Sequence, residues 1–448
     1  MKKIICVLLT VSLILTAFFS FSVPASASFN SLLETEADVV MLINTDTGDV
    51  IFDKNASKRT APASLTKIVT CMLVLENCED LNTVVTAKRE CIEGLYALNA
   101  ATAGIIAGEQ LTVDELLHCL MIPSAADAAN ILADFIGGSM ENFVVMMNDF
   151  VKKLGCENTN FINPSGLDNG DTNMYTTAED LYKITSYALK NPQFRELCSI
   201  LKYQINPTAK YPNIRYLNNT NKMLNSAYKD YYCPYVYGVK TGTTGLAGHC
   251  VITTASKNGY NYMLIVLNAP QYDIDGDGVE ENVAFTDSKK IYEWAFNNIV
   301  LTKVTSKTDI VTVVDVKYNW KKDHVALVPE EEISALVPTG TETASLQIRP
   351  IESETAKTVN APIKKGDVIG KAEVLYGDEL VATVNLVASE DISGSVILRI
   401  GGFLGFLFRT TIMKILVCLA VALLVIYILL IVRRNRIRAK RRKPRRIK

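Results

Sequence analysis

The sequence predicts an α+β fold, with one antiparallel sheet flanked by a helical cluster, then a small all-β domain and a C-terminal transmembrane helix. Alternating, hairpin-like stretches occur near both ends of residues 28–300, and segments with helical periodicity lie between them. This order favours a single sheet packed against the helices. From residue 301 the apolar runs become short and alternating, and one long uncharged run begins at residue 415.

The first domain is expected to begin with a hairpin. Val39–Ile43 and Val50–Phe52 flank the turn Asp46-Thr47-Gly48, a composition typical of paired strands. A helix is expected from Ser64 to about Leu75, because an apolar run follows Ser64 without a helix breaker. Further helices are expected over Val113–Leu120, Asp127–Phe135, Glu141–Leu154 and Asp287–Asn297, and a second hairpin over Cys250–Ala255 and Tyr262–Leu267.

Residues 301–395 are expected to form the all-β domain. Short alternating runs such as Ile310–Val314 and Ser345–Ile348 are broken by turn residues, which is typical of small β domains. No constellation of chemistry-bearing residues accompanies them, so we interpret this domain as a spacer. Residues 396–414 are expected to be a juxtamembrane linker.

The N-terminus has the pattern of a secretory signal peptide over residues 1–27. Lys2 and Lys3 precede an apolar run, and the small residues Ala25-Ser26-Ala27 provide a cleavage site. An uncleaved anchor is the alternative, because the apolar run is long. Both interpretations predict export of the domains that follow.

The C-terminus has the pattern of a membrane anchor. Residues 415–432 carry no charge and would be about 27 Å long as a helix, enough to cross a bilayer. Residues 433–448 carry eight Arg and three Lys and no acidic residue. Because basic segments stay on the cytoplasmic side, the tail is expected inside the cell and the catalytic domain outside.

The nearly neutral total charge conceals an acidic ectodomain. The whole chain has 46 basic and 47 acidic residues, of which 13 basic ones lie in residues 1–27 and 433–448. Residues 28–432 therefore carry a net charge of −14, which argues against nucleic acid as a partner. The ten cysteines include no C-x-x-C pair, and we expect mostly free, buried thiols rather than a zinc site.

Three short segments, far apart in the chain, carry the chemistry. Ser64-Leu65-Thr66-Lys67 places a serine and a lysine on one face of a helix start, so the lysine can take the serine proton. Ser124-Ala125-Ala126 offers a second hydroxyl as a proton relay. Lys240-Thr241-Gly242, on a strand, offers a cation and a hydroxyl for a substrate carboxylate. In this order the segments match the signature of penicillin-recognising serine acyltransferases.

A lysine base fits this chain better than a histidine base. Only three histidines occur, and His118 and His324 lie in an apolar helix and in the β domain, so a Ser-His-Asp triad is poorly supported. Burial and the nearby Lys240 would keep Lys67 neutral. The backbone N–H groups of Ser64 and Thr243 would form the oxyanion hole.

These motifs resemble the low-molecular-mass penicillin-binding proteins, specifically the serine D-alanyl-D-alanine carboxypeptidases. The resemblance covers roughly residues 35 to 395 and rests on these segments: Ala61-Pro62-Ala63-Ser64-Leu65-Thr66-Lys67, Asn163-Pro164-Ser165-Gly166-Leu167-Asp168, Tyr175-Thr176-Thr177-Ala178, Gly238-Val239-Lys240-Thr241-Gly242 and Ala361-Pro362-Ile363-Lys364-Lys365-Gly366-Asp367. It implies a β-lactamase/transpeptidase-like fold for the domain 28–300. It also implies removal of the terminal D-alanine from peptidoglycan pentapeptide stems, and acylation by β-lactams.

The resemblance assigns Ser64, Lys67 and Ser124 as catalytic, and Lys240, Thr241, Gly242 and Thr243 as substrate-binding. No metal and no cofactor are expected.

Two positions depart from the family pattern. Ala126 stands where the family has an asparagine, and Ala284 aligns where many relatives carry an arginine. Asn130 lies one turn further along the helix and is expected to be structural. The chain could therefore be a catalytically weak or inactive module that binds peptidoglycan or β-lactams. A β-lactamase is disfavoured, because the Glu-x-x-Leu-Asn segment that one large class uses for deacylation does not occur.

The segment Asp273-Ile274-Asp275-Gly276-Asp277-Gly278 resembles the start of a calcium loop. Its twelfth position is Ala284 rather than an acid, so an acidic turn is the favoured interpretation.

Overall fold

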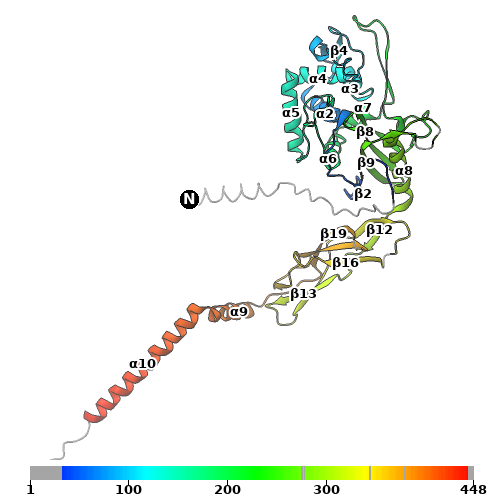
Figure 1. Cartoon of the computed structure of the whole chain (residues 1–448). Coiled ribbons are helices and arrows are strands. Elements are labelled where there is room, and N and C mark those ends of the chain that lie inside the picture. The colour runs from blue at the N-terminus through cyan, green and yellow to red at the C-terminus, as the bar shows by residue number, and fades with distance from the viewer. Residues whose placement is uncertain (1–32, 274–275, 277, 343–344, 378, 442–448) are drawn as a thin grey trace, which may run out of the picture. The chain divides into compact units, whose positions relative to one another are not determined.

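The structure, a computed structural model, describes residues 33–273, 276, 278–342, 345–377 and 379–441. The expected signal peptide and residues 442–448 of the basic tail lie outside the described residues. The chain divides into two compact units (Figure 1). The first contains the chain up to Thr302 together with Ala335–Leu346 and Leu375–Ala382, and the second contains the rest.

The first unit is built on a five-stranded antiparallel sheet with the order β2-β1-β9-β8-β7. The strands are β1 (Val39–Asn44), β2 (Val50–Lys54), β7 (Val236–Thr244), β8 (Gly248–Lys257) and β9 (Tyr260–Ala269). Both predicted hairpins are confirmed, since β1 pairs with β2 and β8 pairs with β9. The two ends of the domain therefore meet in the sheet, with β1 directly beside β9.

Helices cover both faces of this sheet. They are α2 (Lys67–Asn77), α3 (Val113–Met121), α4 (Ala126–Gly137), α5 (Met140–Lys153), α6 (Ala178–Ala188), α7 (Pro192–Ser199) and α8 (Val283–Asn298). Met263 and Ile265 of β9 join the core shared with α2, whereas α8 packs against β8 and β9. The α+β architecture expected from the sequence is confirmed.

The helix boundaries follow their caps. The Ser139 hydroxyl accepts the Asn142 N–H at the start of α5, as its position before an apolar periodic segment predicts. The closing helix α8 begins at Val283, four residues before the predicted Asp287. The physical reason is the Asn282 side chain, which accepts the Ala284 N–H and so caps the helix earlier.

Six short elements lie between α2 and β7 in the sequence. They are the hairpins β3 (Val84–Thr86) with β4 (Gln110–Thr112) and β5 (Lys202–Ile205) with β6 (Arg215–Asn218), and the 3₁₀ turns η3 (Arg89–Cys91) and η4 (Lys222–Leu224). A last small ladder joins β10 (Gln271–Tyr272) to β11 (Glu281–Asn282), just before α8.

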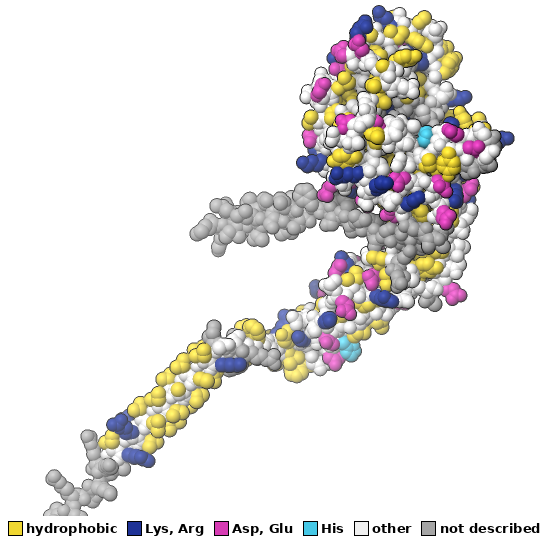
Figure 2. All heavy atoms as spheres, viewed as in Figure 1, with side chains coloured by type: hydrophobic (Ala, Val, Ile, Leu, Met, Phe, Trp, Pro, Cys, Tyr) yellow, Lys and Arg dark blue, Asp and Glu magenta, His cyan; other side chains and the backbone are white. Residues whose placement is uncertain are grey.

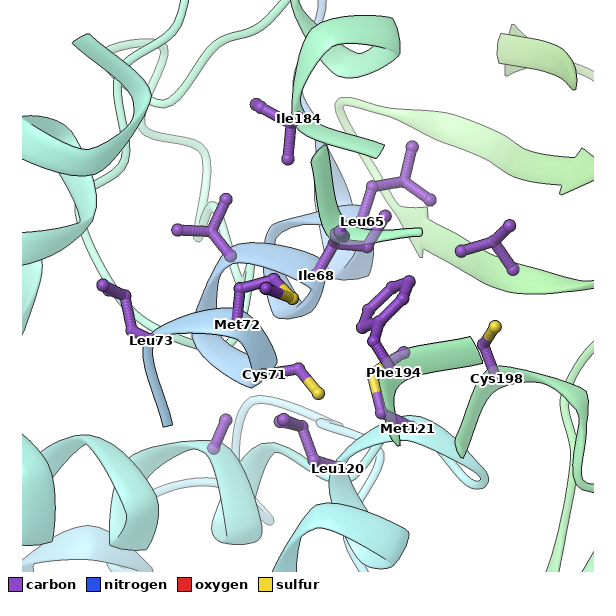
Figure 3. Close-up of a cluster of buried hydrophobic side chains, with 14 of the residues drawn as sticks. Leu65, Ile68, Cys71, Met72, Leu73, Leu120, Met121, Ile184, Phe194 and Cys198 are labelled. Atoms are coloured by element: carbon purple, nitrogen blue, oxygen red, sulfur yellow. The ribbon is translucent and has the colours of Figure 1, made fainter. Parts of the chain in front are cut away.

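Helix α2 runs through the middle of the helical cluster. Residues 67–74 of α2 are all buried. Figure 3 shows Leu65, Ile68 and Met72 surrounded by side chains from other helices, including Phe194 of α7. Because a close-packed core tolerates little displacement, this packing fixes the backbone that carries Ser64 and Lys67.

The second unit contains most of the all-β domain. The strands of this domain, parts of which belong to the first unit, form a six-stranded sheet in the order β16-β18-β19-β14-β13-β17, and β12 pairs with β15. The strands are β12 (Ile299–Thr305), β13 (Thr312–Lys317), β14 (His324–Pro329), β15 (Ile333–Pro338), β16 (Leu346–Pro350), β17 (Thr358–Asn360), β18 (Val368–Tyr376) and β19 (Glu379–Ala388). The all-β expectation for residues 301–395 agrees with this arrangement.

Two helices end the described chain, α9 (Val396–Arg409) and α10 (Thr411–Arg441). The stretch expected as a linker is thus largely helical. Within α10, Met413–Arg438 is long and apolar enough to cross a membrane, with a mean hydropathy of 3.5 over its most apolar window. Its surface is almost entirely hydrophobic, with Lys and Arg near the C-terminal end (Figure 2).

A substitution at Gly166 tests how tightly the loop Asn163–Asp168 packs against the turn that precedes α2. Its φ is +87°, and an added Cβ would lie 1.9 Å from the Ala63 carbonyl oxygen. Gly155 has a similar φ of +74° but no atom within 4 Å of such a Cβ. We expect Gly155→Ala to lower the free energy of unfolding by about 1–2 kcal/mol, the cost of the left-handed backbone alone. Gly166→Ala should cost at least about 3 kcal/mol, because backbone must also move. Equal losses in denaturant titrations would show that the contact at Gly166 is loose.

Candidate active site

Ser64 and Lys67 lie together at the start of α2. Ser64 belongs to the 3₁₀ turn η2 (Ala63–Thr66), which continues directly into the helix. The Lys67 ammonium nitrogen Nζ donates to Ser64 Oγ at 2.8 Å and also donates to the carbonyl oxygen of Ser165. The Lys67 side chain is only 1% exposed. The sequence prediction that these two residues share one helix face is therefore matched by a direct contact.

A second buried lysine comes from the edge strand β7. Lys240 is 2% exposed, and its Nζ donates to the carbonyl oxygen of Thr241 at 3.0 Å. Burial lowers the pKa of Lys240 to about 7. It also lowers the pKa of Lys67 well below its usual value, and the positive charge of Lys240 lowers it further. Lys67 therefore loses its proton more easily than an exposed lysine does.

Ser124 lies in the connection between α3 and α4, two residues before α4 begins. Its side chain is buried, and within the described chain its Oγ has no hydrogen-bond partner. Its φ is +65°, a left-handed conformation uncommon for a residue other than glycine. An unpaired buried hydroxyl on such a backbone is costly, and such outliers concentrate at functional sites. No hydrogen bond joins it to Lys67 or Lys240 in this structure.

Asp127, which the sequence analysis did not single out, holds the start of α4. Its carboxylate accepts the backbone N–H groups of Ala103, Ile105 and Ala128 at 2.9–3.1 Å. Burial raises the pKa of Asp127, and its negative charge acts on Lys67 against the effect of Lys240. An acid in the first turn of a helix was the available signal.

Strand β7 packs closely against the 3₁₀ turn that carries Ser64. A Cβ on Gly242 would lie 3.0 Å from Ala63 Cβ and 3.1 Å from the Ser64 backbone nitrogen. A side chain at this position would therefore push the strand and the turn apart by a few tenths of an ångström. The predicted site residues Lys240, Thr241, Gly242 and Thr243 all lie on this strand.

Two further polar residues, Thr220 and His249, contact the threonines of β7. The Thr220 and Thr241 hydroxyl oxygens are 2.5 Å apart, and Thr243 Oγ1 lies 3.2 Å from His249 Nδ1. Burial, followed by the charge of Lys222, lowers the pKa of His249. The pairing of Thr243 with His249 across the β7–β8 hairpin could have revealed His249 from the sequence. Thr220 gave no such signal.

The Asn163–Asp168 loop ties the helical cluster to the sheet. Asn163 Oδ1 accepts the N–H groups of Ser165 and Gly166 at 3.1 and 2.8 Å. Thr70 of α2 donates to the Pro164 carbonyl, and Thr244 of β7 donates to the Asp168 carboxylate. This loop therefore positions the carbonyl that receives the Lys67 hydrogen bond.

The two unusual alanines are both buried. Ala126 is 2% exposed, and its N–H donates to the Ala101 carbonyl at 2.7 Å. Asn130 donates to the Cys91 carbonyl at 2.9 Å, as expected of a structural residue. Ala284 lies in the first turn of α8, where it is 1% exposed.

The suspected calcium loop lies only partly within the described chain, because residues 274, 275 and 277 are outside it. Asp273 accepts the N–H groups of Gly276 and Gly278, in the manner of a turn. No group of three or more His, Cys, Asp or Glu residues in the described ranges is arranged to hold a metal ion. The nine cysteines of these ranges are free, and seven of them are buried.

Two family models match the chain. Residues 25–271 match the model described as D-alanyl-D-alanine carboxypeptidase. Residues 301–393 match the model of the C-terminal domain of penicillin-binding protein 5.

Individual relatives cover nearly the whole chain. The D-alanyl-D-alanine carboxypeptidase DacF of Bacillus subtilis is 30% identical over 412 residues, covering 92% of this chain and 98% of its own length. DacC of Escherichia coli is 26% identical, covering 89% and 94%. Among solved structures, penicillin-binding protein 5 from Haemophilus influenzae has a TM-score of 0.59 at 26% identity, covering 81% of this chain and 98% of its own.

The coupling between the two buried lysines can be measured directly. Lys240→Met should raise the pKa of Lys67, because it removes a nearby positive charge. Lys222→Met is a matched control, since Lys222 acts on His249 and should raise the pKa of that residue instead. NMR titration of ¹³C-labelled lysine and histidine, with Lys67 assigned through Lys67→Arg, reports both groups. If Lys240→Met left the Lys67 pKa unchanged, the two charges would not interact.

Proposed function

This chain belongs to the family of D-alanyl-D-alanine carboxypeptidases and is a serine peptidase, and we propose that it removes the terminal D-alanine from peptidoglycan pentapeptide stems through an acyl-enzyme on Ser64. One observation carries the proposal: the 2.8 Å contact between Ser64 Oγ and the Nζ atom of a fully buried lysine with a strongly lowered pKa. A nucleophile beside a neutral amine is the arrangement that a lysine-activated serine needs.

In the proposed acylation, neutral Lys67 takes the Ser64 hydroxyl proton while Oγ attacks the carbonyl carbon between the two D-alanines. The C–N bond then breaks, and the proton passes to the leaving amine, with Ser124 as the relay. The unpaired Ser124 hydroxyl supports this role, because it is free to exchange partners. Water then hydrolyses the ester by the reverse proton path and releases the shortened stem.

Substrate recognition is assigned to strand β7. The terminal carboxylate would be held by Lys240 and by the hydroxyls of Thr241 and Thr243, and the oxyanion by the N–H groups of Ser64 and Thr243. The close approach of Gly242 to Ser64 supports this assignment, because it brings the two donors to one side of the nucleophile. β-Lactams would acylate Ser64 in the same way.

We assign the enzyme to the cell membrane. Residues 415–432, which lie within the apolar stretch Met413–Arg438, would be the single span, with the catalytic domain outside the cell and the basic tail inside.

A second candidate function is a catalytically weak or inactive module that binds peptidoglycan or β-lactams. Ala126 favours it, because a carboxamide at that position would orient the substrate amide and Lys67. The enzyme remains the preferred proposal, since the contact of Ser64 with Lys67 is intact.

Labelling with penicillin tests the proposal. Intact-protein mass spectrometry should show one adduct, on the peptide that contains Ser64, and none in Ser64→Ala. Lys67→Arg should slow acylation by roughly 10²–10⁴-fold, because arginine retains its proton near neutral pH. Ser199→Ala, an exposed serine on α7, is the control and should react normally. An adduct that persists in Ser64→Ala would contradict the assignment of the nucleophile.

Restoring the carboxamide tests the role of position 126. Ala126→Asn should raise kcat/KM for D-alanine release by roughly 5–150-fold, the equivalent of about 1–3 kcal/mol from one positioned hydrogen bond. Ala126→Leu has nearly the same shape without hydrogen-bonding groups and should give no gain. If the wild type turns over well and Ala126→Asn brings no gain, the pocket works without this carboxamide. If the wild type and Ala126→Asn both release no D-alanine, the binding module is the better description.

A further inference from the structure

The hairpin of β5 and β6 has an exposed side that the proposed function does not use. Along both strands the side chains alternate between more and less exposed positions, because successive residues of a strand point to opposite faces. Cross-strand partners share a face, so Gln204 lies beside Tyr216 and Lys202 lies beside Asn218. All four side chains are exposed. These four residues are called the outer hairpin face.

The opposite side of the hairpin is anchored in the first unit. Leu217 belongs to its hydrophobic core, and the Tyr203 ring stacks on His118 of α3 with the ring centroids 3.8 Å apart. Arg215 Nη2 donates to both carboxylate oxygens of Glu109 at 3.1 Å, and both side chains are buried. Because separating a buried ion pair is costly, the outer hairpin face is held in a fixed position.

The outer hairpin face leads directly to strand β7. The pairing of β5 with β6 continues to Asn219, and Thr220 follows, with its hydroxyl oxygen 2.5 Å from that of Thr241. Tyr216, Asn218 and Thr220 are alternate, exposed residues. They form a row about 13 Å long, at about 3.3 Å per residue. A substrate held at Thr241 therefore has this row beside it.

The side chains of the outer hairpin face fit a carbohydrate. Tyr216 is 69% exposed, and its ring is a flat apolar surface on which the C–H groups of a sugar ring can pack. Gln204 and Asn218 carry amides, which both donate and accept hydrogen bonds and so suit hydroxyl and acetamido groups. Lys202 adds a cationic donor, and the face has no acidic residue although residues 28–432 carry a net charge of −14. This composition suits a neutral or weakly anionic sugar polymer.

We propose that the outer hairpin face binds the glycan strand from which the pentapeptide stem projects. The ligand is a chain of N-acetylated amino sugars, with one sugar ring packed on Tyr216. Stem and glycan are parts of one polymer, so a surface that continues from the strand that binds the stem is suited to the glycan. This inference rests on the proposed function, because it takes peptidoglycan as the substrate.

Two matched substrates test this subsite. Release of D-alanine by the full-length protein is measured with a free pentapeptide and with the same pentapeptide carried on a glycan chain. Tyr216→Ala should lower kcat/KM for the glycan-linked substrate by roughly 5–20-fold and for the free pentapeptide by less than about twofold. Tyr216→Phe keeps the ring and should behave as the wild type. Trp320→Ala removes an aromatic side chain of similar exposure, 70%, from the β domain and should change neither rate. An equal loss on both substrates, or no loss on either, would overturn the proposal.

A binding measurement tests the same surface without turnover. Full-length Ser64→Ala is applied to beads that carry glycan strands stripped of their stems, and to beads that carry dextran. At least about threefold more protein should bind to the glycan, and adding Tyr216→Ala should remove this preference. Equal binding to both polymers, or a preference that Tyr216→Ala does not reduce, would overturn the subsite. If the wild type releases no D-alanine from either substrate, the proposed function fails, and this binding measurement alone decides the inference.

Discussion

Two buried lysine side chains, close enough for the charge of one to act on the other, are the constraint on which the rest of this structure depends. Lys67 comes from the helical cluster and Lys240 from the edge of the sheet, and both are at most 2% exposed. Burying one ammonium group is unfavourable, and a second one nearby adds repulsion. Both pKa values are therefore lowered. Burial lowers the pKa of Lys240 to about 7, so this side chain is only partly protonated near neutral pH. Such a pair would only destabilise an ordinary core. Here it favours the neutral amine of Lys67 beside Ser64.

This arrangement has a consequence for stability. Each lysine has a lower pKa in the folded protein than in the unfolded chain. At a pH between these two values, the unfolded chain binds more protons than the folded protein. For Lys240 that interval extends from about pH 7 up to its usual pKa of 10.5. The contribution of these groups to stability therefore increases as the pH rises through this window and is lowest below it. Hydrogen bonds join the Asn163–Asp168 loop, whose Ser165 carbonyl accepts from Lys67, to both α2 and β7.

The sequence predicts the contact between Ser64 and Lys67, but it does not predict the partners that come from distant segments. Ser64 and Lys67 are three residues apart on a helix, so their contact follows from local geometry. The carbonyl partner of Lys67 belongs to Ser165, 98 residues away, and no local pattern specifies such a contact. Thr220 was missed for the same reason, since its contact with Thr241 depends on how separate elements pack. His249 was within reach, because hairpin register pairs it with Thr243.

The boundaries of the helices were also predicted less well than the presence of the helices. The start of α8 was predicted four residues late, because the capping Asn282 was not weighed against the apolar pattern. Residues 396–409 were expected to be part of a linker, although their composition permits the helix α9. Among the described residues, contacts within one helix or strand could thus be predicted from the sequence. Contacts between separate elements could be predicted less well.

The pH dependence of Ser64 acylation by a β-lactam tests the central claim most directly. Acylation is proposed to need a neutral Lys67 and a cationic Lys240. The second-order rate constant should therefore be substantial at neutral pH, and it should fall on the alkaline side as Lys240 loses its proton near pH 7. Lys240→Arg should remove that alkaline fall, because arginine keeps its charge. A wild-type rate that instead climbs steadily toward pH 10, as for a lysine with an ordinary pKa, would contradict the account.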